Sequence, residues 1–189
     1  MDQVALPPYL GTPTDEIISL VDDRAKLKLR DFCSGPWYVI AKYHSSFGIP
    51  SGATDITFKF DKKDAGTDNE KIDFVMNFLV DRGKAPTTLQ VDAKMTGDRQ
   101  MTVHVPIPLF PMKVKCTIWG LWQQSLGGSK PKYYAAVIGT DSKNMVYLLR
   151  KGSPKLPDPS FFYDEMCEVA RRSGYKPELI FRCRHTQQH

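Results

Sequence analysis

Short runs of residues in which apolar and polar side chains alternate recur along most of this chain. A side-chain period of two is typical of a β-strand with one buried face, so each run predicts one strand. Turn-forming residues such as Thr96-Gly97-Asp98-Arg99 separate the runs. The eight predicted strands cover residues 37–43, 54–60, 72–80, 87–95, 101–105, 112–122, 133–138 and 145–149.

Eight strands joined mostly by hairpins would leave two unpaired edges in an open sheet. Closing the sheet into a barrel removes both edges. A barrel of about eight strands has an interior that side chains can fill or that holds one small ligand. We therefore expect an all-β fold, an eight-stranded antiparallel up-and-down β-barrel. A sandwich of two sheets is the alternative that periodicity leaves open.

The hydrophobic period changes after the last of these runs. Phe162, Met166, Val169 and Ala170 form one apolar stripe at helical spacing. Gly174 is well placed to end that helix in a left-handed conformation. The sequence thus predicts a helix over residues 160–174 and a last strand over 178–183, after the strands in 36–150. The barrel domain is predicted over residues 28–184, and residues 185–189 form a tail.

The first 27 residues differ from the rest of the chain. They begin with a Pro/Gly segment that has no periodicity. The run Thr14-Asp15-Glu16 then has the composition of a helix start, and Ile17, Ile18 and Val21 would give that helix a short apolar stripe. We expect an N-terminal extension that either packs on the barrel or stays flexible beside it.

The composition is that of an ordinary globular domain, with 41% hydrophobic and 25% charged residues in a chain of 189. No apolar run approaches the roughly 20 residues that a membrane-spanning helix needs. Residues 1–10 lack the basic start and apolar stretch of a secretory signal, which indicates a cytosolic protein or one whose leader has been removed.

The net charge of +5 is mild, and its densest part is the C-terminal end. We interpret this end chiefly as solvated surface. An anionic membrane, an acidic ligand or nucleic acid are the partners that it would otherwise suit. The basic residues there are Arg171, Arg172, Lys176, Arg182 and Arg184.

Three segments resemble the motifs of the lipocalin family, in order and separated by the expected number of strands. Gly35-Pro36-Trp37-Tyr38 is similar to the opening Gly-x-Trp-Tyr motif, a strand ending in Thr140-Asp141 to the second, and the strand that ends near Arg150 to the third. The match is best with the branch of bacterial lipocalins, apolipoprotein D and temperature-induced lipocalins. It covers residues 28–184. It implies a barrel whose closed end is plugged by Trp37 and a helix that packs on the barrel wall after the eighth strand.

In the family, a basic side chain of the third motif stacks on the motif tryptophan. Arg150 or Lys151 would take that position here, and because side chains alternate only one of them can point inward. We favour Arg150, since a planar guanidinium stacks better on an aromatic ring. The structural motif residues are then Gly35, Trp37, Thr140, Asp141 and Arg150.

The resemblance implies a protein that binds a small hydrophobic molecule, such as a fatty acid, lysophospholipid, sterol, retinoid or tetrapyrrole, for transport, storage or protection of membranes under stress. No other cofactor and no nucleic acid is expected. The apolar run 106–111 is interpreted either as a membrane-surface contact or as a loop tucked onto the barrel. With Trp37 placed inside, the predicted ligand-binding residues are Val39, Ala41, Tyr43, Phe58, Phe60, Val103 and Tyr147.

No phosphate loop, catalytic triad or metal motif is present, so the sequence gives no positive indication of an enzyme. His44, His104, His185 and His189 have no ligand spacing. Two alternatives stay open: an enzyme such as an isomerase or de-epoxidase acting on a lipid or carotenoid in the same cavity, and a protein- or nucleic-acid-binding module that uses the basic end. The oligomeric state is also open.

Other residues with reactive or large side chains receive structural interpretations. Cys116 is expected to be a small buried apolar group. Trp119 and Trp122 are three residues apart in one strand, so they should face opposite sides of the sheet. The four cysteines, which contain no CxxC pair, allow two disulfides in three pairings. They are Cys33, Cys116, Cys167 and Cys183, and the strand carboxylates that could be weighed as an acid–base pair are Asp55, Asp73 and Asp92.

Overall fold

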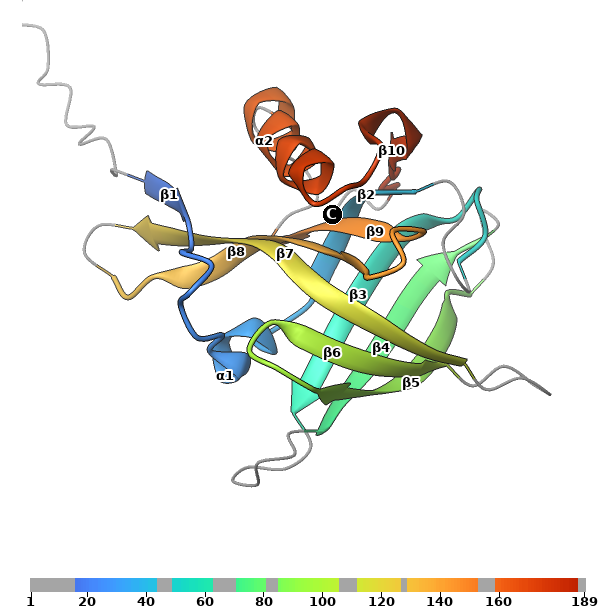
Figure 1. Cartoon of the computed structure of the whole chain (residues 1–189). Coiled ribbons are helices and arrows are strands. Elements are labelled where there is room, and N and C mark those ends of the chain that lie inside the picture. The colour runs from blue at the N-terminus through green and yellow to red at the C-terminus, as the bar shows by residue number, and fades with distance from the viewer. Residues whose placement is uncertain are drawn as a thin grey trace, which may run out of the picture.

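A computed structural model describes residues 16–43, 49–62, 71–80, 85–105, 112–126, 129–152 and 159–186 (Figure 1). The fold is mostly strands, with one long helix. Its elements in chain order are β1 (Glu16–Leu20), α1 (Leu29–Phe32), β2 (Trp37–Tyr43), β3 (Thr54–Lys62), β4 (Lys71–Leu79), β5 (Thr87–Met95), β6 (Gln100–Val105), β7 (Met112–Leu126), β8 (Lys132–Thr140), β9 (Val146–Lys151), α2 (Pro159–Arg172), the 3-10 turn η1 (Pro177–Leu179) and β10 (Ile180–Arg182).

The strands β2 to β9 form a closed antiparallel barrel. Each pairs with the next along the chain, and β9 pairs with β2 to close the ring. All of these pairings are antiparallel, as an up-and-down meander requires. The predicted eight-stranded barrel is confirmed, and each of the eight alternating runs forms one of its strands.

The N-terminal extension adds a strand to the barrel, and the prediction of a helix starting near Thr14-Asp15-Glu16 is wrong over the described residues Glu16–Leu20. β1 pairs with the second half of β7 from Trp122 to Leu126, while β6 pairs with the first half up to Thr117. β7 is 15 residues long and extends beyond its neighbour β6. Without another strand, the backbone groups of this part of β7 that face away from β8 would be unpaired. β1 supplies these bonds, and Figure 1 shows it crossing beside β7. The rest of the Pro/Gly segment lies outside the described residues.

Irregular pairing in β7 changes which way its side chains point. The register with β8 shifts between Ile118 and Gly120, which inserts one extra residue into the alternation. Trp119 and Trp122 therefore pack on the same, outer side of the wall, under α2. The indole of Trp122 donates a 3.0 Å hydrogen bond to Glu165 of that helix. The prediction that the two tryptophans face opposite sides is thus wrong.

The helix α2 covers the outer wall of the barrel. Met166 and Ala170 have no exposed surface and pack against β7 and β8, as the stripe in the sequence predicts. Gly174 follows at φ +90°, a left-handed conformation that suits glycine at a helix end. The side chain of Phe162, also in the predicted stripe, lies outside the described residues. Within the described part of the chain, no helix is long and apolar enough to cross a membrane.

The C-terminal segment completes the wall between β2 and β3. These two strands pair only at Trp37 and Tyr38. Beyond that point β10 pairs with β2, the amide of Cys183 donates to the carbonyl of Ile40, and the amide of Asp55 donates to the carbonyl of Arg184. The segment after the helix therefore lies between the two strands and bonds to both.

All four cysteines are free thiols, which answers the open question of their pairing. Cys33 follows α1 and Cys116 lies in β7, whereas Cys167 lies in α2 and Cys183 follows β10. The fold is therefore stabilised by the barrel hydrogen bonds and by two apolar clusters. The inner core lies inside the barrel, and the outer cluster lies between the barrel wall and α2.

Candidate ligand cavity

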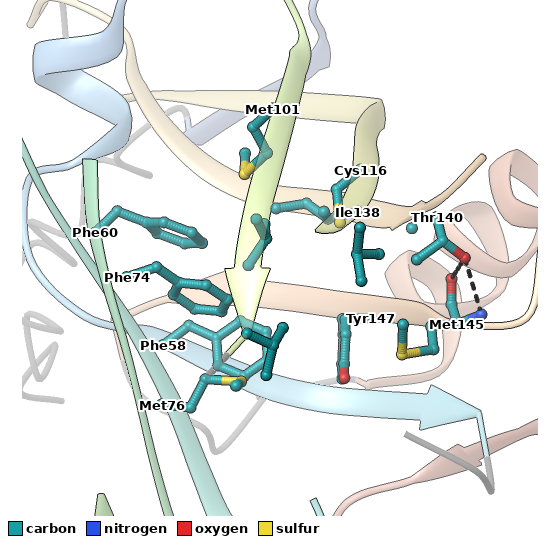
Figure 2. Close-up of a pocket in the computed structure, with 14 residues that line it drawn as sticks. Phe58, Phe60, Phe74, Met76, Met101, Cys116, Ile138, Thr140, Met145 and Tyr147 are labelled. Carbon is teal, nitrogen blue, oxygen red and sulfur yellow. Dashed lines mark hydrogen bonds between the residues drawn. The ribbon is translucent and has the colours of Figure 1, made fainter. Parts of the chain in front are cut away.

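A cavity lies inside the barrel, between the side chains of β3 and β4 on one side and the β8–β9 hairpin on the other (Figure 2). Its exposed lining is entirely apolar. The lining residues are Phe58, Phe60, Phe74, Met76, Met101, Val103, Val105, Val114, Cys116, Ile138, Gly139, Thr140, Met145 and Tyr147.

Aromatic rings fill one side of this space. The rings of Phe60 and Phe74 stack with centroids 4.6 Å apart, and Phe58 meets the edge of Phe74 at 4.9 Å. Tyr147 contacts Phe58 from β9, also at 4.9 Å. Figure 2 shows the three phenylalanines side by side, with Tyr147 between them and the hairpin. The remaining free volume is about 50 Å³, well below the roughly 300 Å³ at which drug-sized ligand sites begin.

Sulfur-containing side chains occupy much of the rest of the lining. Met76, Met101 and Met145 are unbranched and can repack around a guest at small cost. Cys116 also faces the cavity, and burial followed by the nearby Asp141 raises the pKa of its thiol to about 12. A thiol that stays protonated at neutral pH is a weak nucleophile. Cys116 thus contributes an apolar surface to the site.

The β8–β9 hairpin forms one rim of the cavity and is held by its own hydrogen bonds. The hydroxyl of Thr140 donates to Asn144 at 2.7 Å and accepts the amide of Met145 at 3.2 Å. Asp141 accepts a 2.8 Å bond from the hydroxyl of Thr117 on β7. The motif residues Thr140 and Asp141 therefore fix the turn that places Met145 over the cavity.

The opposite end of the barrel is a closed floor. The indole of Trp37 donates a 2.9 Å hydrogen bond to the carbonyl of Phe32 in α1, and the two rings lie 5.0 Å apart. Phe32 also contacts Phe60, at 5.1 Å, which joins the floor to the cavity lining. Gly35, at φ +77°, makes the turn between α1 and β2.

The basic residue that stacks on Trp37 is Lys151, and the prediction of Arg150 is wrong. Lys151 is the direct cross-strand partner of Trp37 on β9, so both side chains share the inner face. Its ammonium lies 4.7 Å from the centre of the indole ring. Arg150, one residue earlier, faces the outer side and lies 4.8 Å from the ring of Tyr134.

The predicted ligand-binding residues divide into three groups. Phe58, Phe60, Val103 and Tyr147 line the cavity. Val39 lies in the inner core but does not reach the cavity. Ala41 and Tyr43 pack in the outer cluster under α2, which corrects the expectation that they point inward.

A bulge in β2 explains this correction. The register of β2 with β9 shifts between Val39 and Ala41, so one extra residue interrupts the alternation. Every side chain after the bulge changes face relative to a regular strand. The position that points inward is therefore Lys42, a charged residue that an alternating pattern would place outside.

Several lining residues were missed although the sequence carries a signal for them. In the run 72–80, Ile72, Phe74, Met76 and Phe78 recur at every second position, and all four are buried inside the barrel. The same alternation places Met101 and Val105 beside Val103 on β6. The pattern predicts which side chains of these two strands point inward, but it does not indicate how far along the barrel the cavity extends.

The strand carboxylates stand apart from the cavity. Asp73 and Asp92 are paired across β4 and β5 on the face opposite Phe74 and Val91. Asp55, at φ 51°, accepts the amide of Thr186 at 2.6 Å. None of the three is among the lining residues, so they form no acid–base pair there.

The described histidines are also away from the cavity. His104 is exposed on β6, and His185 contacts the carbonyl of Val39 at 3.0 Å. His44, His189 and the apolar run 106–111 lie outside the described residues. In the described ranges, no group of three or more histidine, cysteine or carboxylate side chains could hold a metal ion.

The basic C-terminal end is partly neutralised by its own helix. Arg171 and Arg172 both bond to Glu168, at 2.7 and 2.8 Å. These two bonds lower the pKa of Glu168 to about 2. Arg182 lies 4.2 Å from the ring of Tyr163. Three of the five basic residues thus have partners within the protein, which weakens the case for a nucleic-acid surface.

The chain matches no model of a known protein family and no curated protein sequence. The fold defines it as an eight-stranded antiparallel β-barrel with a C-terminal helix packed on the outer wall.

Proposed function

We propose that this protein is a lipocalin-type binding protein that holds a small hydrophobic molecule inside its barrel, for transport or storage. The observation that carries the proposal is the cavity with an entirely apolar lining, between the aromatic cluster and the β8–β9 hairpin. Removing apolar ligand surface from water contributes roughly 25 cal/mol per Å². A cavity with apolar walls inside a closed barrel is a place where such a ligand loses its contact with water.

The shape of the space favours a slim ligand. About 50 Å³ is free, so a guest needs the methionines and Tyr147 to change rotamers. An unbranched alkyl chain needs fewer of the close-packed lining side chains to move than the fused rings of a sterol or a tetrapyrrole. Among the ligand classes that the resemblance implies, single-chain lipids are therefore the best supported.

The proposal is tested by titration with an uncharged fluorescent probe of slim shape, the linear polyene alcohol parinarol, followed by displacement with single-chain lipids, sterols, retinoids and haem. Saturable one-to-one binding, with displacement by single-chain lipids in preference to sterols, is the expected result. Absence of saturable binding to the folded protein would contradict the proposal and direct attention to the surface.

A pair of neighbouring variants locates the binding site. Val103→Phe fills the cavity from β6 and should weaken probe binding at least about tenfold, while overpacking costs about 1–3 kcal/mol of stability. His104→Phe adds a similar ring one residue away on the exposed face and should leave binding unchanged. Equal affinity of both variants for the probe would show that the ligand binds elsewhere.

A further inference from the structure

Lys42, near the end of β2, is a charged side chain buried in the barrel wall, with 4% of its surface exposed. Ala41 and Tyr43, on either side of it, pack in the outer cluster. Since side chains alternate along a strand, Lys42 points to the inner side. Its cross-strand partner on β9 is Tyr147, which lines the cavity. Directly opposed side chains lie next to each other, so the Lys42 side chain begins beside a lining residue, although Lys42 itself does not line the cavity.

The ammonium group of Lys42 has poor partners. Its one hydrogen bond among the described residues is a long one, 3.4 Å, to the carbonyl of the adjacent Tyr43. No described carboxylate forms an ion pair with it. The nearby Cys183 is a neutral thiol at physiological pH, because burial raises its pKa to about 11. Burial in turn lowers the pKa of Lys42.

A buried positive charge without a counter-ion is unfavourable, and proteins normally pair such groups. Arg150 is the only other charged residue that is buried in the described part of the chain, and it faces the outer side of the wall over Tyr134. The inner wall at this end of the barrel therefore holds one positive charge that no described residue balances.

We propose that Lys42 binds the carboxylate of the ligand, so that the ligand class of this barrel is an apolar monocarboxylic acid. This inference rests on the proposed binding function and narrows it. The hydrocarbon part would occupy the cavity beside Tyr147, and the carboxylate would replace the missing counter-ion. A single amine balances one negative charge, which suits a carboxylate better than a doubly charged phosphate that calls for several donors.

The experiment compares saturated fatty acids with the corresponding primary alcohols of equal chain length, as displacers of the uncharged probe. Wild-type protein should prefer each acid over its alcohol by about tenfold or more, as expected for a hydrogen bond to a charged group. Lys42→Met keeps the length of the side chain without its charge, and should bring this ratio close to one while leaving the affinity for the alcohol unchanged. Lys42→Gln provides a second neutral variant.

A matched control separates the buried amine from the general charge of the surface. Lys113 is an exposed lysine on β7 at the same end of the barrel, next to the cavity-lining Val114 and on the opposite face. Lys113→Met removes the same charge and should keep the preference for the acid.

Three outcomes would overturn the inference. If acids and alcohols displace the probe equally from the wild type, or if Lys42→Met and Lys42→Gln keep the preference, the amine is not the anchor although the barrel still binds apolar ligands. If Lys113→Met loses the preference as fully as Lys42→Met, the surface field accounts for it. If the probe itself does not bind, the proposed function fails, and the inference fails with it.

Discussion

Two lysines lie on the inner wall of the barrel, one at each end, and their surroundings differ. At the floor, Lys151 donates to the carbonyl of Asp31 at 2.6 Å and to the hydroxyl of Ser34 at 2.9 Å, over the ring of Trp37. At the other end, Lys42 donates one 3.4 Å bond to a neighbouring backbone carbonyl. Lys42 is buried and Lys151 is half-buried, and Lys151 has two short hydrogen bonds to protein groups where Lys42 has one long one.

This difference separates a structural end of the barrel from a binding end. A buried polar group whose partners are all present contributes to the native fold, whereas one without partners costs stability. Unfavourable groups of this kind are found where a protein binds something else. Mutations at the floor should therefore lower the stability of the protein. Mutations at the opposite end, where Lys42 lies, should change ligand binding.

The largest expected effect is on the floor tryptophan. Trp37 is fully buried and contacts Phe32, so Trp37→Ala should lower the free energy of unfolding by about 3–5 kcal/mol. Met145→Ala, which truncates a partly exposed side chain over the cavity, should cost less than about 2 kcal/mol. Urea denaturation monitored by far-ultraviolet circular dichroism measures both. Equal losses would contradict the division into a structural and a binding end.

A second, smaller effect distinguishes the two lysines directly. Lys151→Met removes two hydrogen bonds and should lower the free energy of unfolding by about 1–2 kcal/mol. Lys42→Met removes a charge that lacks a counter-ion, so the unliganded protein should be as stable as the wild type or more so. Thermal unfolding of the two variants side by side is the measurement. Destabilisation of the Lys42 variant comparable to that of the Lys151 variant would show that Lys42 has a structural role.

The fold could be predicted because its main determinants are local and periodic. Each alternating run became one strand, and the helical stripe with Met166 and Ala170 became α2. The strand β1 was missed for a non-local reason. Thr14-Asp15-Glu16 has the local composition of a helix start, but Glu16–Leu20 forms a strand, because β7 extends beyond β6 and offers backbone groups for pairing. Tertiary context of this kind overrides local propensity.

The site could be predicted less well, because bulges decide which side chains point inward. An extra residue near Ile40 turned Ala41 and Tyr43 outward and Lys42 inward, and another turned Trp119 outward beside Trp122. Neither bulge is marked by a recognisable residue pattern. An assignment of inward and outward side chains that assumes strict alternation is therefore wrong beyond each bulge.

The choice between Arg150 and Lys151 failed for a related reason. Chemical preference favoured arginine for stacking on the indole, but the position is decided by register: Lys151 is the residue that pairs with Trp37. Strand pairing fixes the face of a side chain before its chemistry can matter.

The smallest expected effect is a pH dependence that belongs to the floor lysine. Burial lowers the pKa of Lys151 from its ordinary value of 10.5 to about 8, although Cys33 and Asp31 nearby offset part of this. Between these two pH values the unfolded chain binds a proton that the folded protein has lost, so this group makes the folded state more stable as pH rises. Because Lys151 is partly exposed, solvent screening keeps the effect below that of deleting the side chain.

Other groups oppose this trend in the wild type, so the variant is needed to reveal it. Burial raises the pKa of the thiols of Cys116 and Cys183 above their ordinary value of 9.0. Above that pH the unfolded chain loses protons that the folded protein retains, and stability falls. These contributions are shared by the wild type and Lys151→Met, and they cancel in the difference between the two. The stability advantage of the wild type should therefore grow between pH 8 and pH 10.5. A difference that stays constant over this range would mean that the hydrogen bonds to Asp31 and Ser34 already replace the hydration of the ammonium in full.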